Sequence, residues 1–502
     1  MFSKIPTHYL AAALMCIWGG VLLYFNAVRL DAFAIDEGAA HALLLNWSIA
    51  DKIVNSVATF GGPDFRALLF FPLGLYWPGS IIAAKVFTII ISFLGVAGMY
   101  YWSRKQQNEE VALIATGLLL IAPVTIQLAD QIAVGPYLLL MFMAATWLDG
   151  KYRASPHSVS SLYFLQCILI AITVTFHPMG LAYPVALAWH WYNNPKPGEQ
   201  MQKQQKQVWL GIGIAVFIIL AMQTGWIELA WFRNPAESLN QAILGFDEVA
   251  GSDATIWPGY LLLILVFYTA ARTAKSALTD FASGMLLAAL VLGLCAADGS
   301  WAFIAILYLL YFGLPLLIRL NQKLGMNNFI GQRGLVFLLI IAATSLFMQV
   351  NKSHAQIIAS GILSARDQLI QTLAQEAKQT DQAFLAASEW PARTMIICKR
   401  DVLRLPPAAA TGEELLKSIS GITHVMFNHQ NPANSALAKN FSEVTTRTET
   451  LAVQDGGVII KIRQPVTTPA TGHPQKGDEN QQETTLTPGA DIPSMDTAPL
   501  QK

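Results

Sequence analysis

Two adjacent carboxylates, Asp36 and Glu37, follow the first long apolar run of this 502-residue chain. Charged residues make up 13% of the sequence, against about 25% in soluble domains, so the composition is that of a membrane protein. Carboxylates that lie at the edge of a bilayer and face other helices are costly there and usually functional. The pair is therefore a candidate for chemistry at this edge of the membrane rather than for spanning alone.

The same pair has a purely structural interpretation. Asp36 is typical of a helix N-cap, and Glu37 would lie in the first turn, where a negative charge is favourable. His41 follows Glu37 by four residues, so the two side chains could pair across one turn of a helix. The local sequence leaves both interpretations open.

Lys85 is the only charged residue well inside a predicted apolar segment. A lysine near the end of a spanning helix can extend its ammonium group back to the membrane surface. A cation at that depth also lies where the phosphate of a lipid head group would be. Lys85 is therefore a candidate phosphate-binding residue, and snorkelling is its alternative.

Four more polar residues fall in loops predicted to lie on the same side as Asp36. Asp130 and His177 are in short loops, and Asp64 and Arg66 are in a long one. Short loops are often polar for solvation alone, and a lone histidine is more often structural than a ligand. The convergence of all these residues on one face is stronger evidence for a site than any single residue.

Apolar segments of nearly spanning length set the framework around these residues, since a membrane helix needs about 20 apolar residues. There are eleven such segments, at 8–29, 79–102, 111–129, 132–148, 159–176, 178–193, 208–226, 256–271, 281–297, 301–318 and 334–350. Lysine and arginine gather in the loops on one side, which the positive-inside rule assigns to the cytoplasm. The N-terminus is then cytoplasmic. A signal-peptidase site at residues 32–34 is the alternative, although the first apolar segment is long for a signal peptide.

The first outer loop has a helical pattern of its own. Residues 37–50 and 64–77 each predict an amphipathic helix that lies in the membrane interface. A Gly-Gly-Pro turn at 61–63 separates them. This loop would hold the acidic pair against the ends of the spanning helices.

The C-terminal third differs from the rest in composition. Its predicted elements are a polar helix at 353–377, a strand at Thr394–Cys398, a helix at 412–419, a strand at His424–Phe427 and a strand pair within 447–463 that turns at Gly456-Gly457. The predicted fold is a polytopic α-helical membrane domain (1–350) followed by a small soluble α/β domain on the periplasmic side (351–464). Residues 465–502 are rich in Thr, Pro and Gln and predict a disordered tail.

The first 200 residues or so resemble the GT-C superfamily of membrane glycosyltransferases, of the protein-mannosyltransferase and aminoarabinose-transferase type. The resemblance rests on the acidic pair within Ala-Ile-Asp-Glu-Gly-Ala at 34–39, on the loop that follows, and on the segment 77–87. In that segment Lys85 stands where the family commonly has an arginine. The first outer loop departs from the family, because Gly62-Pro63-Asp64 stands where relatives often have Lys-Pro-Pro or His-Pro-Pro.

This resemblance implies an inverting glycosyltransferase at the outer face of the cell inner (cytoplasmic) membrane. Its donor would be a sugar linked to a polyprenyl phosphate, and its acceptor a lipid, a glycan or a protein. A divalent cation is a candidate cofactor. A good leaving group such as a lipid phosphate needs no strong general acid, so one carboxylate acting as a base can suffice.

The resemblance also implies a role for each candidate residue. Asp36 would be the general base, Glu37 would orient it or bind a metal, and Asp130 would hold the acceptor or assist. The cations expected to meet the donor phosphate are Lys85 and Arg66. Further candidate contacts to substrate or metal are Asp64, His41 and His177.

Two other functions stay open at this point. A transporter of lipid-linked sugars would favour broken helices, internal repeats and polar groups near the bilayer midplane, whereas the polar residues here gather at one face. A catalytically silent relative that serves in binding or assembly is kept open by the departure in the first outer loop. The formal net charge of +0 excludes nucleic acid as a partner, because there is no basic excess.

Overall fold

The computed structural model describes most of the helical part and nearly all of the α/β part. The described residues are 7–28, 35, 37–51, 69–77, 80–122, 124–125, 128, 132–154, 160–194, 235–236, 239, 257–277, 280–294, 299–323, 365–380, 384–454 and 456–463. All of them belong to one compact unit, Met1–Arg463, and Gln464–Lys502 form a second. The predicted disordered tail lies outside the described residues.

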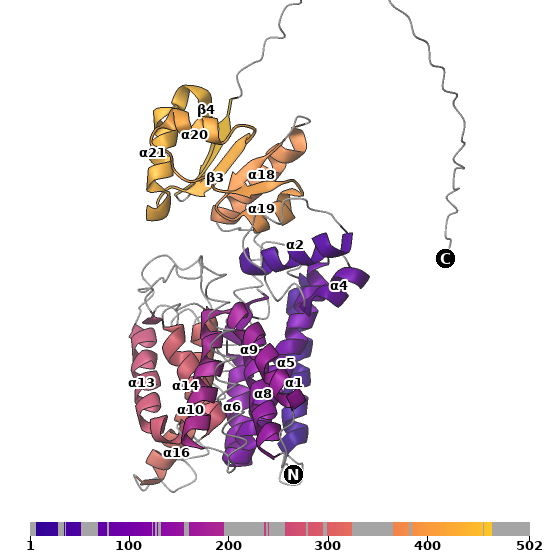
Figure 1. Ribbon diagram of the computed structural model, residues 1–502, viewed down its shortest axis with the longest axis vertical. Coiled ribbons are helices and arrows are strands. Elements are labelled where there is room, and N and C mark those ends of the chain that lie inside the picture. The colour runs from indigo at the N-terminus through magenta and orange to yellow at the C-terminus, as the bar shows by residue number, and fades with distance from the viewer. Residues whose placement is uncertain are drawn as a thin grey trace, which may run out of the picture. The chain divides into compact units, whose positions relative to one another are not determined.

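The N-terminal two thirds of the described chain are helical (Figure 1). The longer helices are α1 (Thr7–Val28), α2 (Glu37–Asp51), α5 (Ile81–Gln106), α6 (Glu109–Ile121), α8 (Val134–Ala154), α9 (Ser160–Phe176), α10 (Ala182–Asn193), α13 (Trp257–Ala277), α14 (Phe281–Gly293), α15 (Gly299–Tyr308) and α16 (Leu314–Lys323). Shorter ones are α4 (Phe71–Tyr76), the 3₁₀ turn η4 (Pro178–Leu181) and the π-helical turn η6 (Leu309–Gly313), which joins α15 to α16.

Helices coincide with the predicted spans wherever the structure describes them. The spans predicted at 208–226 and 334–350 lie outside the described residues. Within the described part, Ile81–Gln106 and Ser300–Arg319 are long and apolar enough to cross a membrane. Shorter apolar helices lie at His8–Gly20, Phe164–Val174 and Phe281–Gly293. The number of eleven spans therefore stays a prediction.

Buried hydroxyl pairs join neighbouring helices of this bundle. Thr88 and Tyr137 connect α5 to α8, with 2.7 Å between their oxygens. Pairs of the same kind and length are Thr116–Tyr311, from α6 to η6, and Thr273–Tyr308, from α13 to α15. In an apolar surrounding such a bond removes two polar groups that would otherwise lack partners, which favours a single packing arrangement.

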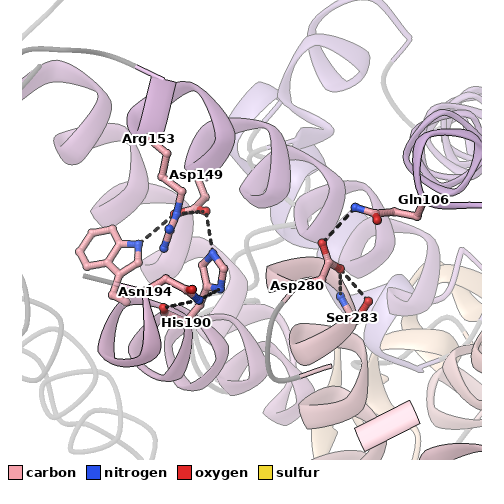
Figure 2. Close-up of polar contacts among 8 residues, drawn as sticks. Gln106, Asp149, Arg153, His190, Asn194, Asp280 and Ser283 are labelled. Atoms are coloured by element: carbon pink, nitrogen blue, oxygen red, sulfur yellow. Dashed lines mark hydrogen bonds and ion pairs between the residues drawn. The ribbon is translucent and has the colours of Figure 1, made fainter. Parts of the chain in front are cut away.

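A buried ionic cluster connects α8 to α10 near the predicted cytoplasmic ends of these helices (Figure 2). The Asp149 carboxylate accepts a hydrogen bond from Trp191 Nε1 at 2.9 Å and pairs with Arg153 Nε at 2.9 Å. His190 Nε2 lies 3.7 Å from the same carboxylate. Asp149 is 3% exposed, and a buried carboxylate needs such partners to be tolerated.

The C-terminal part contains one five-stranded sheet with the order β2-β1-β3-β5-β4. The strands are β1 (Ala386–Ser388), β2 (Val402–Arg404), β3 (His424–Asn428), β4 (Thr448–Gln454) and β5 (Gly457–Ile462). The first three are parallel, and β5 is antiparallel to both β3 and β4. The predicted α/β class, the strand at 424 and the hairpin around Gly456, which has a φ of 81°, are confirmed.

Helices cover both faces of this sheet (Figure 1). The covering helices are α18 (Ala365–Gln379), α19 (Pro391–Cys398), α20 (Gly412–Ser418) and α21 (Ser435–Glu443). Strand β3 shows the alternation that this requires, because Met426 belongs to the apolar cluster of α18 and α19, whereas Val425 and Phe427 belong to that of α20 and α21. The predicted helix at 412–419 is confirmed.

The strand predicted at Thr394–Cys398 is wrong, because these residues form the end of helix α19. A short apolar run does not distinguish a buried strand from a buried helix. Pro391 at the first helical position favours a helix start. Lys399, with a φ of 52°, ends the helix in the left-handed region.

Helix α2 is confirmed as a helix but not as an amphipathic one. Buried positions include Ala39, Ala40, Ala42, Leu43 and Leu44, which at 3.6 residues per turn cover more than half of its circumference. One side packs on α4 and another on α19 of the α/β part. A helix buried on two sides has no reason to keep a polar face. Of the second predicted interfacial helix, 64–77, the structure describes Phe71–Tyr76 as α4.

Candidate active site

One apolar cluster brings together the segments that carry the main candidate residues. Ile35, the residue before Asp36, and Ala39 of α2 belong to it, and so do Ala84 of α5 and Ile132, which opens the segment leading into α8. The same cluster continues into α18 and α19 of the α/β part. The segments on either side of Asp36 and the start of the second predicted span thus belong to one apolar cluster, whereas the convergence of the candidate residues themselves stays a prediction.

Lys85 lies in the first turns of α5, directly after Ala84, and is 1% exposed. It is among the largest fully buried side chains of the described chain. Snorkelling to the surface, the alternative interpretation, is not what the structure shows. Burying an ammonium group costs several kcal/mol unless an anion or strong acceptors meet it.

Aromatic side chains fix the wall around Lys85. Thr88, one turn further along α5, accepts or donates a hydrogen bond with Tyr137 of α8 at 2.7 Å. Phe70 packs edge-on against both Tyr137 and Phe87, with ring centroids 6.2 and 5.9 Å apart. These contacts lock the start of α4, α5 and α8 against one another, so the backbone beside Lys85 is held rigidly.

Ile132 has a left-handed backbone, with a φ of 57°, and is fully buried. A β-branched residue is rarely found there, and the conformation costs on the order of 1–3 kcal/mol. Strain of this kind is concentrated at functional sites. Ile132 follows Asp130 by two residues in the sequence and leads into α8.

Glu37 is the first residue of α2, and its carboxylate binds the N-terminus of helix α19. Oε1 accepts a hydrogen bond from Ala392 N at 2.6 Å, and Oε2 accepts one from Arg393 N at 3.1 Å. These are N–H groups of a first helical turn, which have no partners within their own helix. Helix α19 has no side-chain cap of its own, because its N-cap residue is Trp390. Glu37 therefore supplies the missing cap from another part of the chain.

The two histidines occupy different surroundings. His41 lies on α2 and is half-buried, one turn after Glu37. His177 caps the turn η4, because its Nδ1 accepts a hydrogen bond from Met179 N at 3.2 Å. Met179 belongs to the core of the helical bundle rather than to the cluster around Lys85. The structure thus gives His177 the structural role and does not bring it to the other candidates.

Four predicted site residues, Asp36, Asp64, Arg66 and Asp130, lie outside the described residues. Within the described part, no group of three or more His, Cys, Asp or Glu side chains could hold a metal ion. Both oxygens of Glu37 accept backbone N–H bonds. The described donors do not fit a divalent cation.

The contact between Glu37 and α19 was not predicted from the sequence. A signal for it exists, because Pro391 marks a helix start and Trp390 cannot cap it with its side chain. A helix start without a local cap implies an acceptor from elsewhere in the chain. The identity of that acceptor could not be read from the sequence, since the two partners are separated by more than 350 residues.

No protein-family model matches the chain, and no curated protein matches it at a significant level. Solved structures similar to it include two of ArnT and one of an oligosaccharyltransferase. The apo crystal structure of ArnT from Cupriavidus metallidurans is 14% identical and gives a TM-score of 0.50 over 90% of this chain and 98% of that one. ArnT from the same organism bound to undecaprenyl phosphate is 13% identical and gives 0.44 over 90% and 97%.

The third is the oligosaccharyltransferase of Archaeoglobus fulgidus tethered with an acceptor peptide. It is 12% identical and gives a TM-score of 0.47 over 94% of this chain and 75% of that one. We base the fold assignment on apo ArnT, which is matched over nearly its whole length. The chain has the fold of ArnT, and its described part is mostly helical with a C-terminal α/β part.

Proposed function

We propose that the chain is an inverting glycosyltransferase that takes a sugar from a polyprenyl-phosphate donor at the outer face of the cytoplasmic membrane. The observation that carries the proposal is the full burial of Lys85 at the start of α5. Its neighbour Ala84 packs in the same cluster as Ile35 and Ala39, which flank the acidic pair. A phosphate leaving group needs a cation nearby, and the attacking acceptor needs a base. A buried cation next to a carboxylate segment can supply both.

The shared fold supports the class of donor. ArnT has the fold of this chain, and it has also been solved with undecaprenyl phosphate bound, a polyprenyl phosphate. The basic residues place the N-terminus in the cytoplasm and the α/β part outside. On this orientation the acidic pair and Lys85 lie at the outer face, where a lipid-linked sugar presents its phosphate.

The reaction needs one base and one cation. A hydroxyl or amine of the acceptor attacks the anomeric carbon while the carboxylate of Asp36 takes its proton. The bond between the anomeric carbon and the phosphate oxygen breaks, and the electron pair leaves with the polyprenyl phosphate. Attack from the opposite side inverts the anomeric configuration. The ammonium of Lys85 stabilises the charge that develops on the leaving phosphate.

The Asp36→Asn variant distinguishes a role of Asp36 as the general base from a role as a helix N-cap. Asparagine caps a helix about as well as aspartate, but it cannot take a proton. We expect turnover to fall about 10²–10⁴-fold, with donor binding retained and the thermal midpoint unchanged. The assay is sugar transfer from a polyprenyl-phosphate donor, with protein level measured in parallel. Turnover close to that of the wild type would refute Asp36 as the base. It would favour the interpretation that the chain is a catalytically silent relative.

Replacing Lys85 by methionine tests the donor site. Methionine matches the length of lysine and suits a buried position, so the fold should hold. We expect kcat/KM for the donor to fall about 10²-fold, mostly through a higher KM. Lys105→Met is the matched control, because Lys105 lies exposed at the other end of the same helix. Equal effects of the two substitutions would exclude a specific role for Lys85.

A further inference from the structure

We infer that Glu37 is a positioning residue, through which the C-terminal α/β domain holds the catalytic segment in place. This inference rests on the proposed function, since it concerns the residue next to the proposed base. The resemblance left two roles for Glu37, orienting Asp36 or binding a metal. The structure gives its carboxylate a third set of partners, the backbone N–H groups at the start of α19.

The geometry of this contact is that of a bidentate anion at a helix N-terminus. Ala392 N donates to one carboxylate oxygen at 2.6 Å and Arg393 N to the other at 3.1 Å. The first position of the helix is Pro391, which has no N–H to satisfy. The partial positive charge at the start of α19 stabilises the carboxylate further.

Helix α19 is itself held firmly in its domain. The side chain of Arg393 is 4% exposed and its Nη2 lies 2.7 Å from Asp367 Oδ1 of α18. Met395 and Cys398 are buried in the cluster that also contains Leu43 and Leu44 of α2. The partner of Glu37 is thus a rigid element rather than a loop, so the contact can transmit position.

The consequence concerns Asp36. A carboxylate anchored by two hydrogen bonds fixes the backbone of Glu37, and Asp36 is joined to it by one peptide bond. Ile35, on the other side, is 1% exposed within the same cluster. The two residues next to Asp36 in the chain are therefore fixed, Ile35 by the apolar cluster and Glu37 by the start of α19.

The test follows two readouts in the full-length protein. Cys398 lies at the end of α19 and its thiol is buried, so its rate of labelling by a maleimide reports how often α19 separates from its surroundings. The other three cysteines, Cys16, Cys167 and Cys295, are replaced by serine in every variant. The second readout is kcat and KM for sugar transfer from the polyprenyl-phosphate donor.

For Glu37→Gln we expect Cys398 to be labelled about 2- to 30-fold faster, the range that corresponds to losing a helix cap worth 0.5–2 kcal/mol. We expect kcat to fall by up to about 10²-fold, as misplacement of a reacting group by about 1 Å can cause, with KM within about twofold. Glu37→Asp keeps the charge on a shorter side chain. Its labelling rate and its kcat should therefore both lie between those of Glu37→Gln and those of the wild type. Glu413→Gln, which removes an exposed carboxylate of α20, should change neither.

Each other outcome overturns the inference. A loss of turnover with unchanged labelling would mean that Glu37 acts on the substrate or on a metal. Faster labelling with unchanged kcat would mean that the cap is structural and does not position Asp36. If the wild type transferred no sugar, the proposed function would fail, and labelling would still decide whether Glu37 holds α19.

Discussion

The buried ion pair between Arg393 and Asp367 should contribute much of the free energy that keeps helix α19 in place. The Arg393→Met variant tests this contribution. The two side chains are 4% and 10% exposed, with 2.7 Å between Nη2 and Oδ1. Removing one partner of a buried pair costs about 3–5 kcal/mol, because the other charge stays buried. Arg366 Nε lies 3.5 Å from the same oxygen and offsets part of the loss. We therefore expect about 3 kcal/mol, which raises the population of opened α19 about 10²-fold.

Cys398 makes this opening measurable. Burial raises the pKa of its thiol to about 12, and its Sγ lies 4.0 Å from the carbonyl oxygen of Ile370 in α18. Thiolate is the reactive form, so the thiol reacts slowly while α19 stays in place. In a background without the other cysteines, labelling of Cys398 should be about 10²-fold faster in Arg393→Met than in the parent protein.

The double variant Asp367→Leu/Arg393→Met is the control for this result. Replacing a whole buried pair by apolar residues is often neutral, so labelling should return to within a few-fold of the parent rate. The backbone N–H of Arg393 that meets Glu37 is kept in both variants. Labelling in Arg393→Met within twofold of the parent would refute the reasoning, because the ion pair would then not hold α19.

Two further predictions concern a titrating histidine and a helix contact. Burial and the nearby Lys461 charge lower the pKa of His424, so the unfolded chain takes up its proton first as the pH falls below about 6.5. The α/β domain should therefore lose stability as the pH falls below that value, and His424→Gln should flatten this dependence in thermal scans. Tyr137→Phe should lower the stability of the helical part by about 0.6 kcal/mol through loss of the 2.7 Å bond to Thr88; an effect above 2 kcal/mol in denaturant titrations would contradict a single hydrogen bond.

Much of the helical framework could be predicted, because a helix that crosses the membrane needs a long apolar segment. The predicted spans coincide with helices wherever the chain is described, for example 79–102 with Ile81–Gln106. Ser80 also caps this helix, accepting a hydrogen bond from Ala83 N at 3.2 Å, as its residue type predicts. Capping and hydropathy act over a few residues, so a single sequence contains them.

The errors lie where distant parts of the chain meet. Residues 394–398 were expected to be a strand because their apolar run has the length of one, yet they form α19, whose cap comes from Glu37. Helix α2 was expected to have one polar face, yet Leu43 and Leu44 are both buried because a second partner covers it. The first error results from an apolar run too short to distinguish a strand from a helix, and the second from a tertiary contact that overrides a local preference.

The contact between α2 and α19 also changes what the composition boundary near residue 350 means. Composition separates an apolar N-terminal part from a polar C-terminal part, but packing does not stop there, because one cluster contains Ala84 of α5, Leu43 of α2 and Leu369 of α18. The two buried sides of helix α2 are both apolar. Without α18 and α19, the helix would therefore expose apolar surface next to the acidic pair. Glu37, the neighbour of the proposed base, and helix α19 of the C-terminal part are then coupled through α2.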